Sequence, residues 1–171
     1  MDNVVMARAD LIAKFRDEPI LTKMLTEEEI KNIPEVLLVF FADTLSEGRS
    51  ISFQPLGHLV LCKVKPRMII APNKKKAPTK SALTVRMRQL PSKPYHKATQ
   101  LASVMASKTP YDVFLSTIIL RVWFQFLESC AKHSAKIQLR GFGRFYVRKK
   151  QVKQVLNFAP FPKLLAKLND N

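Results

Sequence analysis

One stretch decides how the chain is interpreted: His58-Leu59-Val60-Leu61-Cys62-Lys63-Val64-Lys65-Pro66-Arg67-Met68-Ile69-Ile70. Apolar and polar residues alternate along most of it, which is typical of a β-strand. A segment rich in Pro, Asn and Lys follows at 71–78, and a second alternating run occupies 81–90. We therefore predict a two-stranded ribbon with a turn at 71–78, because proline and asparagine favour turns over strand interiors.

The charges of this ribbon follow the same alternation. A period of two places Lys63, Lys65 and Arg67 on one face of the outgoing strand. It also places Arg86 and Arg88 on one face of the returning strand. We expect a ribbon with a cationic face, a shape that fits a nucleic-acid groove. The alternative is a basic hairpin that faces only solvent.

The overall charge points to a polyanionic partner. The 171 residues carry a formal net charge of +16 at pH 7. Ten of the thirteen acidic residues lie in residues 1–50, and residues 51–111 contain none. A phosphate-binding surface benefits from such segregation, whereas solubility alone does not require it.

The number of cysteines and the hydropathy limit the cellular compartments in which we expect the protein. Cys62 and Cys130 are the only cysteines, so we expect neither a disulfide framework nor a zinc site. No apolar run reaches the roughly 18 residues of a membrane span, and residues 1–5 do not resemble a signal peptide. We therefore expect a reduced, intracellular protein that is not secreted and has no membrane partner.

The sequence shows no catalytic constellation. His58, His96 and His133 have no Cys or carboxylate partners at motif spacing, and four glycines leave little material for a nucleotide-binding loop. We therefore expect no enzyme activity, no catalytic residue, no metal and no cofactor.

A similar order of elements occurs twice. One helix begins with the capping-box signature Thr26-Glu27-Glu28-Glu29, and another begins at Thr109-Pro110. Each is followed by a strand, a glycine-containing turn, a basic hairpin, a proline-containing segment and a helix. The second hairpin, at 146–158, is the shorter. We interpret this order as an internal duplication in which 45–59 corresponds to 129–145, with a small length difference at the turn.

The segment Lys136-Ile137-Gln138-Leu139-Arg140-Gly141-Phe142-Gly143-Arg144-Phe145 resembles the strand–turn–strand signature of the bacterial HU and integration host factor DNA-bending family. Pro55-Leu56-Gly57-His58-Leu59 resembles a degraded form of the same turn. Leu90-Pro91-Ser92 is similar to the step by which that family leaves its arm. The resemblance spans nearly the whole chain, but the family's Arg-Asn-Pro tip is replaced by Ala71-Pro72-Asn73.

The resemblance implies an architecture. The family works as a dimer whose two β-arms reach around the minor groove, each with a proline that wedges between base pairs. A tandem copy implies a monomeric, single-chain α+β pseudodimer. Its first repeat would be 1–94, with a long arm at about 58–90, and its second would be 95–171, with a shortened hairpin. Residues 95–107 could close the first repeat, open the second, or do both.

Candidate nucleic-acid-binding residues come from both hairpins, because each phosphate contact releases counterions and arginine can enter a narrow minor groove. Pro72, with Ile70 as a second candidate, is the expected wedge, and the alternative is that Pro72 only shapes the turn. The candidate contacts are Lys63, Lys65, Arg67, Pro72, Lys74, Lys75, Lys76, Lys80, Arg86, Arg88, Lys93, Arg140, Arg144, Arg148, Lys149, Lys150 and Lys153.

We therefore expect an architectural protein that binds double-stranded DNA and bends or compacts it with little sequence specificity. RNA is a possible second ligand. Such a protein would reside in a nucleoid or in a viral or phage DNA compartment. The alternative is a structural component of a ribonucleoprotein or virion that uses an HU-like fold for RNA or protein contacts. The degraded first turn and the short second hairpin favour this alternative.

Overall fold

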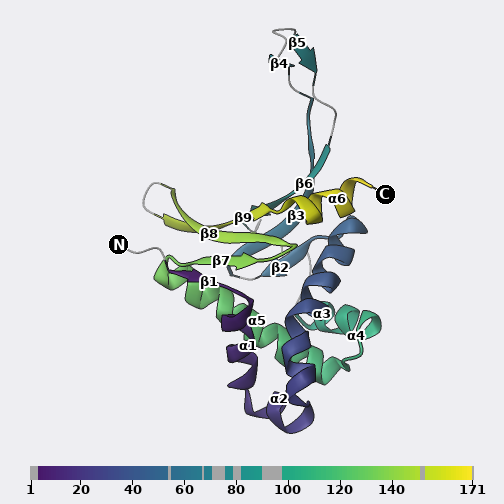
Figure 1. Ribbon diagram of the computed structural model, residues 1–171, viewed down its shortest axis with the longest axis vertical. Helices are drawn as coiled ribbons and strands as arrows, with labels where there is room; N and C mark the ends of the chain where they lie inside the picture. Colours follow the sequence, from purple (N-terminus) through teal and green to yellow (C-terminus); the bar gives the residue numbers. More distant parts are fainter. Residues whose placement is uncertain are drawn as a thin grey trace.

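A layer of strands covers a layer of helices, and a thin two-stranded arm projects from the strand layer (Figure 1). The computed structural model describes residues 4–53, 55–66, 68–70, 76–78, 82–89, 98–150 and 153–170. Within these residues the chain is a mixture of helices and strands that pair antiparallel except for β1 with β7, so the expected α+β class is confirmed.

The described residues form six helices and nine strands. They are β1 (Val5–Met6), α1 (Arg8–Arg16), α2 (Pro19–Met24), α3 (Glu27–Ser46), β2 (Ile51–Phe53), β3 (Gly57–Val64), β4 (Met68–Ile70), β5 (Lys76–Pro78), β6 (Ala82–Arg88), α4 (Ala98–Lys108), α5 (Val113–His133), β7 (Lys136–Leu139), β8 (Gly143–Lys150), β9 (Lys153–Pro160) and α6 (Pro162–Asn169).

The strand layer is built from two sheets. Their strand orders are β1-β7-β8-β9 and β2-β3-β6, and β6 lies beside β9. Read outward from this seam, the order is β9-β8-β7 on one side and β6-β3-β2 on the other. Each side is therefore a three-stranded antiparallel meander that follows a long helix, α5 or α3. We call α3-β2-β3-β6 the first unit and α5-β7-β8-β9 the second unit.

The long helices of the two units begin and end in the same way. Thr26 caps α3 by accepting a hydrogen bond from the Glu29 amide, and Asp112, 86 positions later, caps α5 by accepting from the Leu115 amide. A residue with left-handed backbone follows each helix, Gly48 (φ 78°) after α3 and Ser134 (φ 52°) after α5, again 86 positions apart.

The turns after the first strands also correspond. The Leu56 amide donates to the Phe53 carbonyl, and the Phe142 amide donates to the Leu139 carbonyl. Pairing is also equivalent, because Ile51 faces Leu59 as Ile137 faces Phe145. The offset stays at 86 from the helix caps through the turn. The expected length difference at the turn is therefore wrong.

Glycine is required at the start of the hairpin in each unit. A Cβ atom on Gly57 would lie 2.7 Å from the Arg88 carbonyl oxygen, and one on Gly143 would lie 2.7 Å from the Ala159 carbonyl oxygen. A side chain at either position would push the first hairpin strand away from the second. This gives the two glycines the structural role expected for a close approach of backbones.

The two units share one core. Phe41 and Phe53 of the first unit pack against Trp123 of the second, with ring centroids 5.6 and 6.1 Å apart. Phe53 also meets Phe145 edge to face at 6.2 Å. These rings are fully buried, so neither unit has a separate core.

Helices α4 and α6 lie outside the two units, and each packs against one of them. α4 packs along α5 as α1 packs along α3, so the described part of 95–107 opens the second unit. α6 packs against α3 and β6, which belong to the first unit. Its Asn169 side chain binds both backbone groups of Leu83, accepting from the amide at 2.7 Å and donating to the carbonyl at 3.0 Å.

α5 is long and apolar enough, by length and composition, to cross a membrane. In the fold its apolar stripe faces inward, where Trp123, Phe126 and Leu127 are fully buried. This position is the one that a core helix occupies, so the composition of α5 has an explanation within the protein itself.

Candidate nucleic-acid interface

The arm is one antiparallel ribbon wherever the structure describes it. Val64 pairs with Ala82 in β3–β6, and Met68 pairs with Pro78 in β4–β5. The register is unchanged between the two ladders, so the predicted long hairpin is confirmed for the described residues. The predicted turn at 71–78 is too long, because Lys76–Pro78 forms a strand. Proline is tolerated there because the ribbon has two exposed edges.

The cations at the base of the arm do not share one face. Lys63 pairs with Leu83, on the face whose residues Leu59 and Val85 are buried against the helices. Arg86 and Arg88 pair with Val60 and His58, on the opposite face. The expected single cationic face is therefore wrong at this level. Alternation fixes the face within each strand, but only the pairing register relates the two strands.

The face of the strand layer that points away from the helices gathers cations from both units. Arg144, Tyr146 and Arg148 of β8 alternate with core residues, and Arg144 and Arg148 pair with Ala159 and Val155 of β9. The last described pair joins Lys150 to Lys153. We define the cationic outer face by its described side chains: Arg86, Arg88, Arg144, Arg148 and Lys153. All but Arg144 are exposed, and Arg144 is half-buried.

Acidic residues are absent from both hairpins. Residues 51–111 and 129–169 contain no Asp or Glu. The ion pairs of the described residues join helices or their ends: Arg8–Glu35, Arg16–Glu27, Arg49–Glu47, Lys108–Glu47, Arg121–Glu18 and Lys167–Asp43. Across the described part of the chain, no carboxylate lies within 4.0 Å of a cation on the outer face.

Arg144 has an environment suited to an external anion. Its guanidinium carbon lies 5.6 Å from the centre of the Tyr146 ring, a cation–π distance that restrains the side chain. Its Nε atom is buried and has no hydrogen-bond partner among the described residues. Because Arg144 as a whole is only half-buried, an external anion would meet the rest of the guanidinium rather than this Nε atom.

His58 occupies the position that Arg144 occupies in the second unit, 86 residues later. It is buried at 5% exposure and pairs with Arg88 across the ladder. Burial, together with the Arg88 charge, lowers the pKa of His58 below its ordinary value. The first unit therefore carries a neutral imidazole where the second carries a guanidinium.

Several predicted contacts lie elsewhere or outside the described residues. Arg140 is on the β7–β8 turn beside α3 and α6 rather than on the outer face. Lys149 pairs with Gln154 on the inner face, and Lys65 follows Lys63 beyond the ladder. Outside the described residues or side chains lie Arg67, Ile70, Pro72, Lys74, Lys75, Lys76, Lys80, Lys93 and Lys150.

Sequence reasoning missed two residues of this region. Tyr146 supports Arg144, and its alternation with Arg144 and Arg148 was the available signal. Asn169 fixes α6 to β6 at the base of the arm. No local pattern identifies Asn169, because its partner Leu83 is 86 residues away.

The described residues offer little material for catalysis. No group of three or more His, Cys, Asp or Glu side chains that could hold a metal occurs among them. Burial, with a smaller effect of Asp10, raises the pKa of the Cys130 thiol to about 11. That thiol is therefore protonated at neutral pH and is a poor nucleophile.

Comparison with known proteins does not add a relative. No family model matches the chain, and no curated protein sequence matches it.

Proposed function

We propose that the protein is an architectural binder of double-stranded DNA that bends or compacts the duplex with little sequence specificity. It would act without catalysis. The observation that carries the proposal is the cationic outer face, which has no carboxylate partner in the described part of the chain and is flanked by a projecting arm. A duplex laid across the strand layer would meet this face and the arm together.

The charge arrangement favours phosphates over a protein ligand. Binding of cations to duplex phosphates releases counterions, a gain that does not depend on sequence. Both hairpins lack acidic residues over their whole length, so nothing along the strand layer would repel the backbone. The Arg144 guanidinium is restrained by the Tyr146 ring and has no carboxylate partner among the described residues, so it can bind a phosphate without first breaking an ion pair.

We further propose that the two units are HU-like repeats fused into a pseudodimer. The mirrored strand order around the β6–β9 seam, the constant offset of 86 and the matched glycine turns support this proposal. A dimer built in this way has both halves in one chain, so it needs no second copy to complete the strand layer. Sedimentation of the free protein at micromolar concentration should give a monomer.

A specific observation supports the alternative ligand, RNA. Only one of the two hairpins extends into an arm, so the protein lacks the paired arms with which a symmetric binder embraces DNA. A single arm over a cationic face could also hold duplex RNA through its phosphates.

A competition titration separates these functions. A labelled DNA duplex is bound at about 50 and about 200 mM salt, and unlabelled duplex DNA or duplex RNA of the same length displaces it. The proposal predicts that DNA competes better at both salt concentrations and that affinity falls steeply between them. If RNA competes better, the ribonucleoprotein function replaces the proposal. If neither duplex binds, both are wrong.

A further inference from the structure

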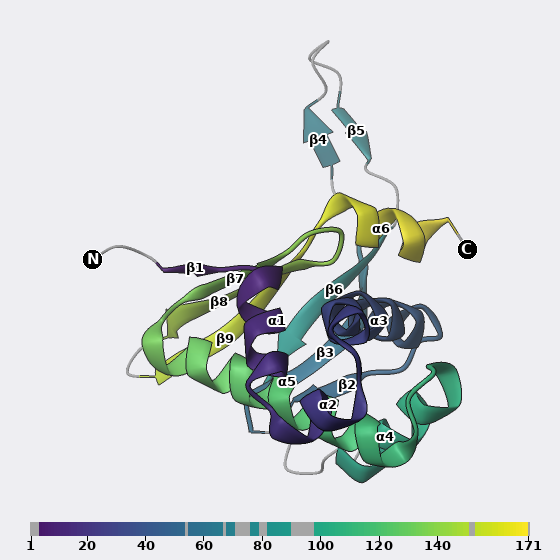
Figure 2. The ribbon, with the colours of Figure 1, turned by 60° about the horizontal axis from the view of Figure 1, so that its bottom comes forward.

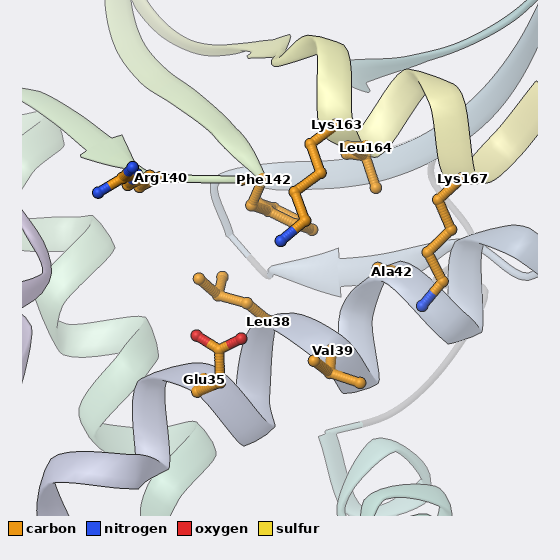
Figure 3. Close-up of a pocket in the computed structure, with 10 residues that line it drawn as sticks. Glu35, Leu38, Val39, Ala42, Arg140, Phe142, Lys163, Leu164 and Lys167 are labelled. Atoms are coloured by element: carbon orange, nitrogen blue, oxygen red, sulfur yellow. The ribbon is translucent and has the colours of Figure 1, made fainter.

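A cleft lies between α3 and α6, next to the β7–β8 turn (Figure 3). It consists of two adjoining parts that share Glu35, Leu38, Arg140, Gly141 and Lys163, and the larger part has a volume of about 820 Å³. The α3 wall belongs to the first unit, whereas the turn and α6 belong to the second half of the chain. The cleft therefore exists once, at the junction of the two halves.

The wall formed by the turn and α6 carries two free cations. Arg140 and Lys163 are exposed and have no carboxylate partner among the described residues. Figure 3 shows Lys163 reaching from α6 toward the α3 wall. The other cations of the cleft are already paired, Arg8 with Glu35 at 3.3 Å and Lys167 with Asp43. The cleft therefore has an excess of positive charge on one side only.

The floor of the cleft is apolar. Leu38, Phe142 and Leu164 are buried beneath it, and Val39 is 47% exposed. Leu38 and Val39 follow Glu35 by three and four residues, so both lie beside Glu35 on one side of α3. No described residue covers Val39.

Comparison with α5 indicates that the fold does not require this apolar floor. At the offset of 86, Val39 corresponds to Gln125, which is exposed, and Ala42 corresponds to Glu128. The second long helix therefore tolerates polar side chains at the positions where the first presents apolar ones. Ala42 is buried in the core, but Val39 is 47% exposed, so core packing does not explain the apolar character of Val39.

We propose that this cleft binds an acidic segment of a partner protein, an amphipathic helix with apolar side chains along one face and carboxylates beside them. The apolar side chains lie on Leu38, Val39 and Phe142, and the carboxylates pair with Arg140 and Lys163. This is the helix-in-groove mode of recognition. The partner chemistry follows from charge complementarity, since the free charges of the cleft are positive and its floor is apolar.

Nucleic acid fits the cleft less well than an acidic helix. A phosphate backbone gains nothing from contact with the exposed Val39 side chain, whereas an amphipathic helix would bury apolar side chains there. The cleft also lies between helices, whereas the cationic outer face is on the opposite side of the strand layer. A partner protein and a duplex can therefore be bound at the same time.

The test uses the full chain and a fluorescent synthetic helix of about 15 residues, with leucines at i, i+3, i+4 and i+7 and glutamates on the flanks. Its control replaces every glutamate with glutamine. We expect the glutamate peptide to bind and the glutamine peptide to bind about tenfold more weakly. Equal binding of the two peptides would remove the basis of the proposal.

Variants of the protein locate the site. Val39→Lys places a charge on the exposed floor, and Arg140→Ser with Lys163→Ser removes the free cations. Each should weaken binding of the glutamate peptide about tenfold or more. Gln125→Lys, the matched position on α5, should leave binding unchanged. Because residues 39, 140 and 163 are exposed, folding should be preserved, and thermal unfolding verifies this.

Two outcomes would overturn the inference. If Val39→Lys and Gln125→Lys weaken peptide binding equally, the cleft is not the site. If duplex DNA displaces the peptide, and the Arg140→Ser and Lys163→Ser variant loses DNA affinity but not peptide affinity, the cations belong to the nucleic-acid surface. Simultaneous binding of labelled peptide and duplex to one molecule would support the inference.

Discussion

The two hairpins are alike at the base and different beyond it. β3 and β8 each have eight residues and occupy equivalent positions, and Val64 pairs with Ala82 where Lys150 pairs with Lys153. After Lys150 the second hairpin turns back within two residues, whereas the first continues into the arm (Figure 2). The fold therefore needs only the short form. The arm is an addition to a scaffold that both units share. We therefore expect ligand binding, rather than folding, to determine its sequence.

The composition of the addition agrees with this conclusion. Residues 65–81 contain no acidic residue. Their cations are Lys65, Arg67, Lys74, Lys75, Lys76 and Lys80. A segment whose charged residues are all cations is suited to phosphate contacts.

The largest effect should come from converting the first hairpin into the form of the second. Residues 65–81 are replaced by Asn-Gly, which joins Val64 to Ala82 through a two-residue turn. The thermal midpoint should change little, because the core of the described residues includes none of this segment. DNA affinity at about 0.1 M salt should fall by roughly two orders of magnitude, since six cations are lost. A fluorescence titration measures the change.

Two outcomes sharpen or break this prediction. Substitution of Pro72 by Ala should reduce the bend of a doubly labelled duplex at little cost in affinity if Pro72 is a wedge. An unchanged end-to-end distance would make Pro72 a turn former only. If the shortened protein binds DNA as tightly as the original, the arm is not part of the interface.

The next effect concerns the matched glycines. Gly57→Ala and Gly143→Ala should each lower the free energy of unfolding by about 1–3 kcal/mol, because the new methyl group meets a backbone carbonyl oxygen. The two substitutions add different strain, since alanine at position 57 would keep an unfavourable φ of 136°, whereas the methyl group at position 143 would also lie 2.3 Å from the Phe158 ring. Gly48→Ala is the control, with φ of 78° and no atom within 4 Å of the added carbon. Urea denaturation should rank the losses with Gly48→Ala smallest, and a larger loss there would contradict the equivalence of the turns.

The smallest effect concerns the pH dependence of stability, to which His58, the counterpart of Arg144, should contribute. The folded state lowers the pKa of His58, so below the ordinary value of about 6.5 the unfolded chain binds a proton more readily than the folded one. Stability from the neutral imidazole is therefore complete above that pH and is lost as pH falls through the lowered pKa. His58→Asn should show a shallower decline of unfolding free energy on acidification. The exposed His133→Asn serves as the control, and equal declines in both variants would show that burial of His58 is not the cause.

Much of the fold could be predicted because its signals are local. The capping box at Thr26 located the start of α3, and alternation at 58–70 located the arm. The start expected at Thr109-Pro110 is wrong by three residues, because Asp112 caps α5 and the helix begins at Val113. The repeated order of elements was also visible, since helix, glycine turn and hairpin recur in sequence. These signals depend only on residues that are close in sequence, so they can be recognised before the structure is known.

The errors arose where information is not local. Alternation could not reveal that Lys63 and Arg86 lie on opposite faces, because pairing register joins residues far apart in sequence. The length of the turn was overestimated because Lys76–Pro78 forms a strand despite its proline. The cleft beside Val39 and the anchoring of Leu83 by Asn169 join parts of the chain that no local pattern connects.

The most direct test of the central claim is the salt dependence of DNA binding in two matched variants. One carries Arg→Gln at Arg86, Arg88, Arg144 and Arg148. The other carries Lys→Gln at four exposed lysines of the helical layer, Lys14, Lys23, Lys31 and Lys132. Both lose the same formal charge, so any difference between them reports position.

The slope of log affinity against log salt concentration is the quantity to compare. If each outer-face arginine contacts one phosphate, its loss should flatten the slope by about 0.9, or by roughly 3 to 4 for the set. The helical-layer variant should flatten it by less than about 1. If both variants flatten the slope equally, DNA responds only to net charge, and the outer face is not the binding surface.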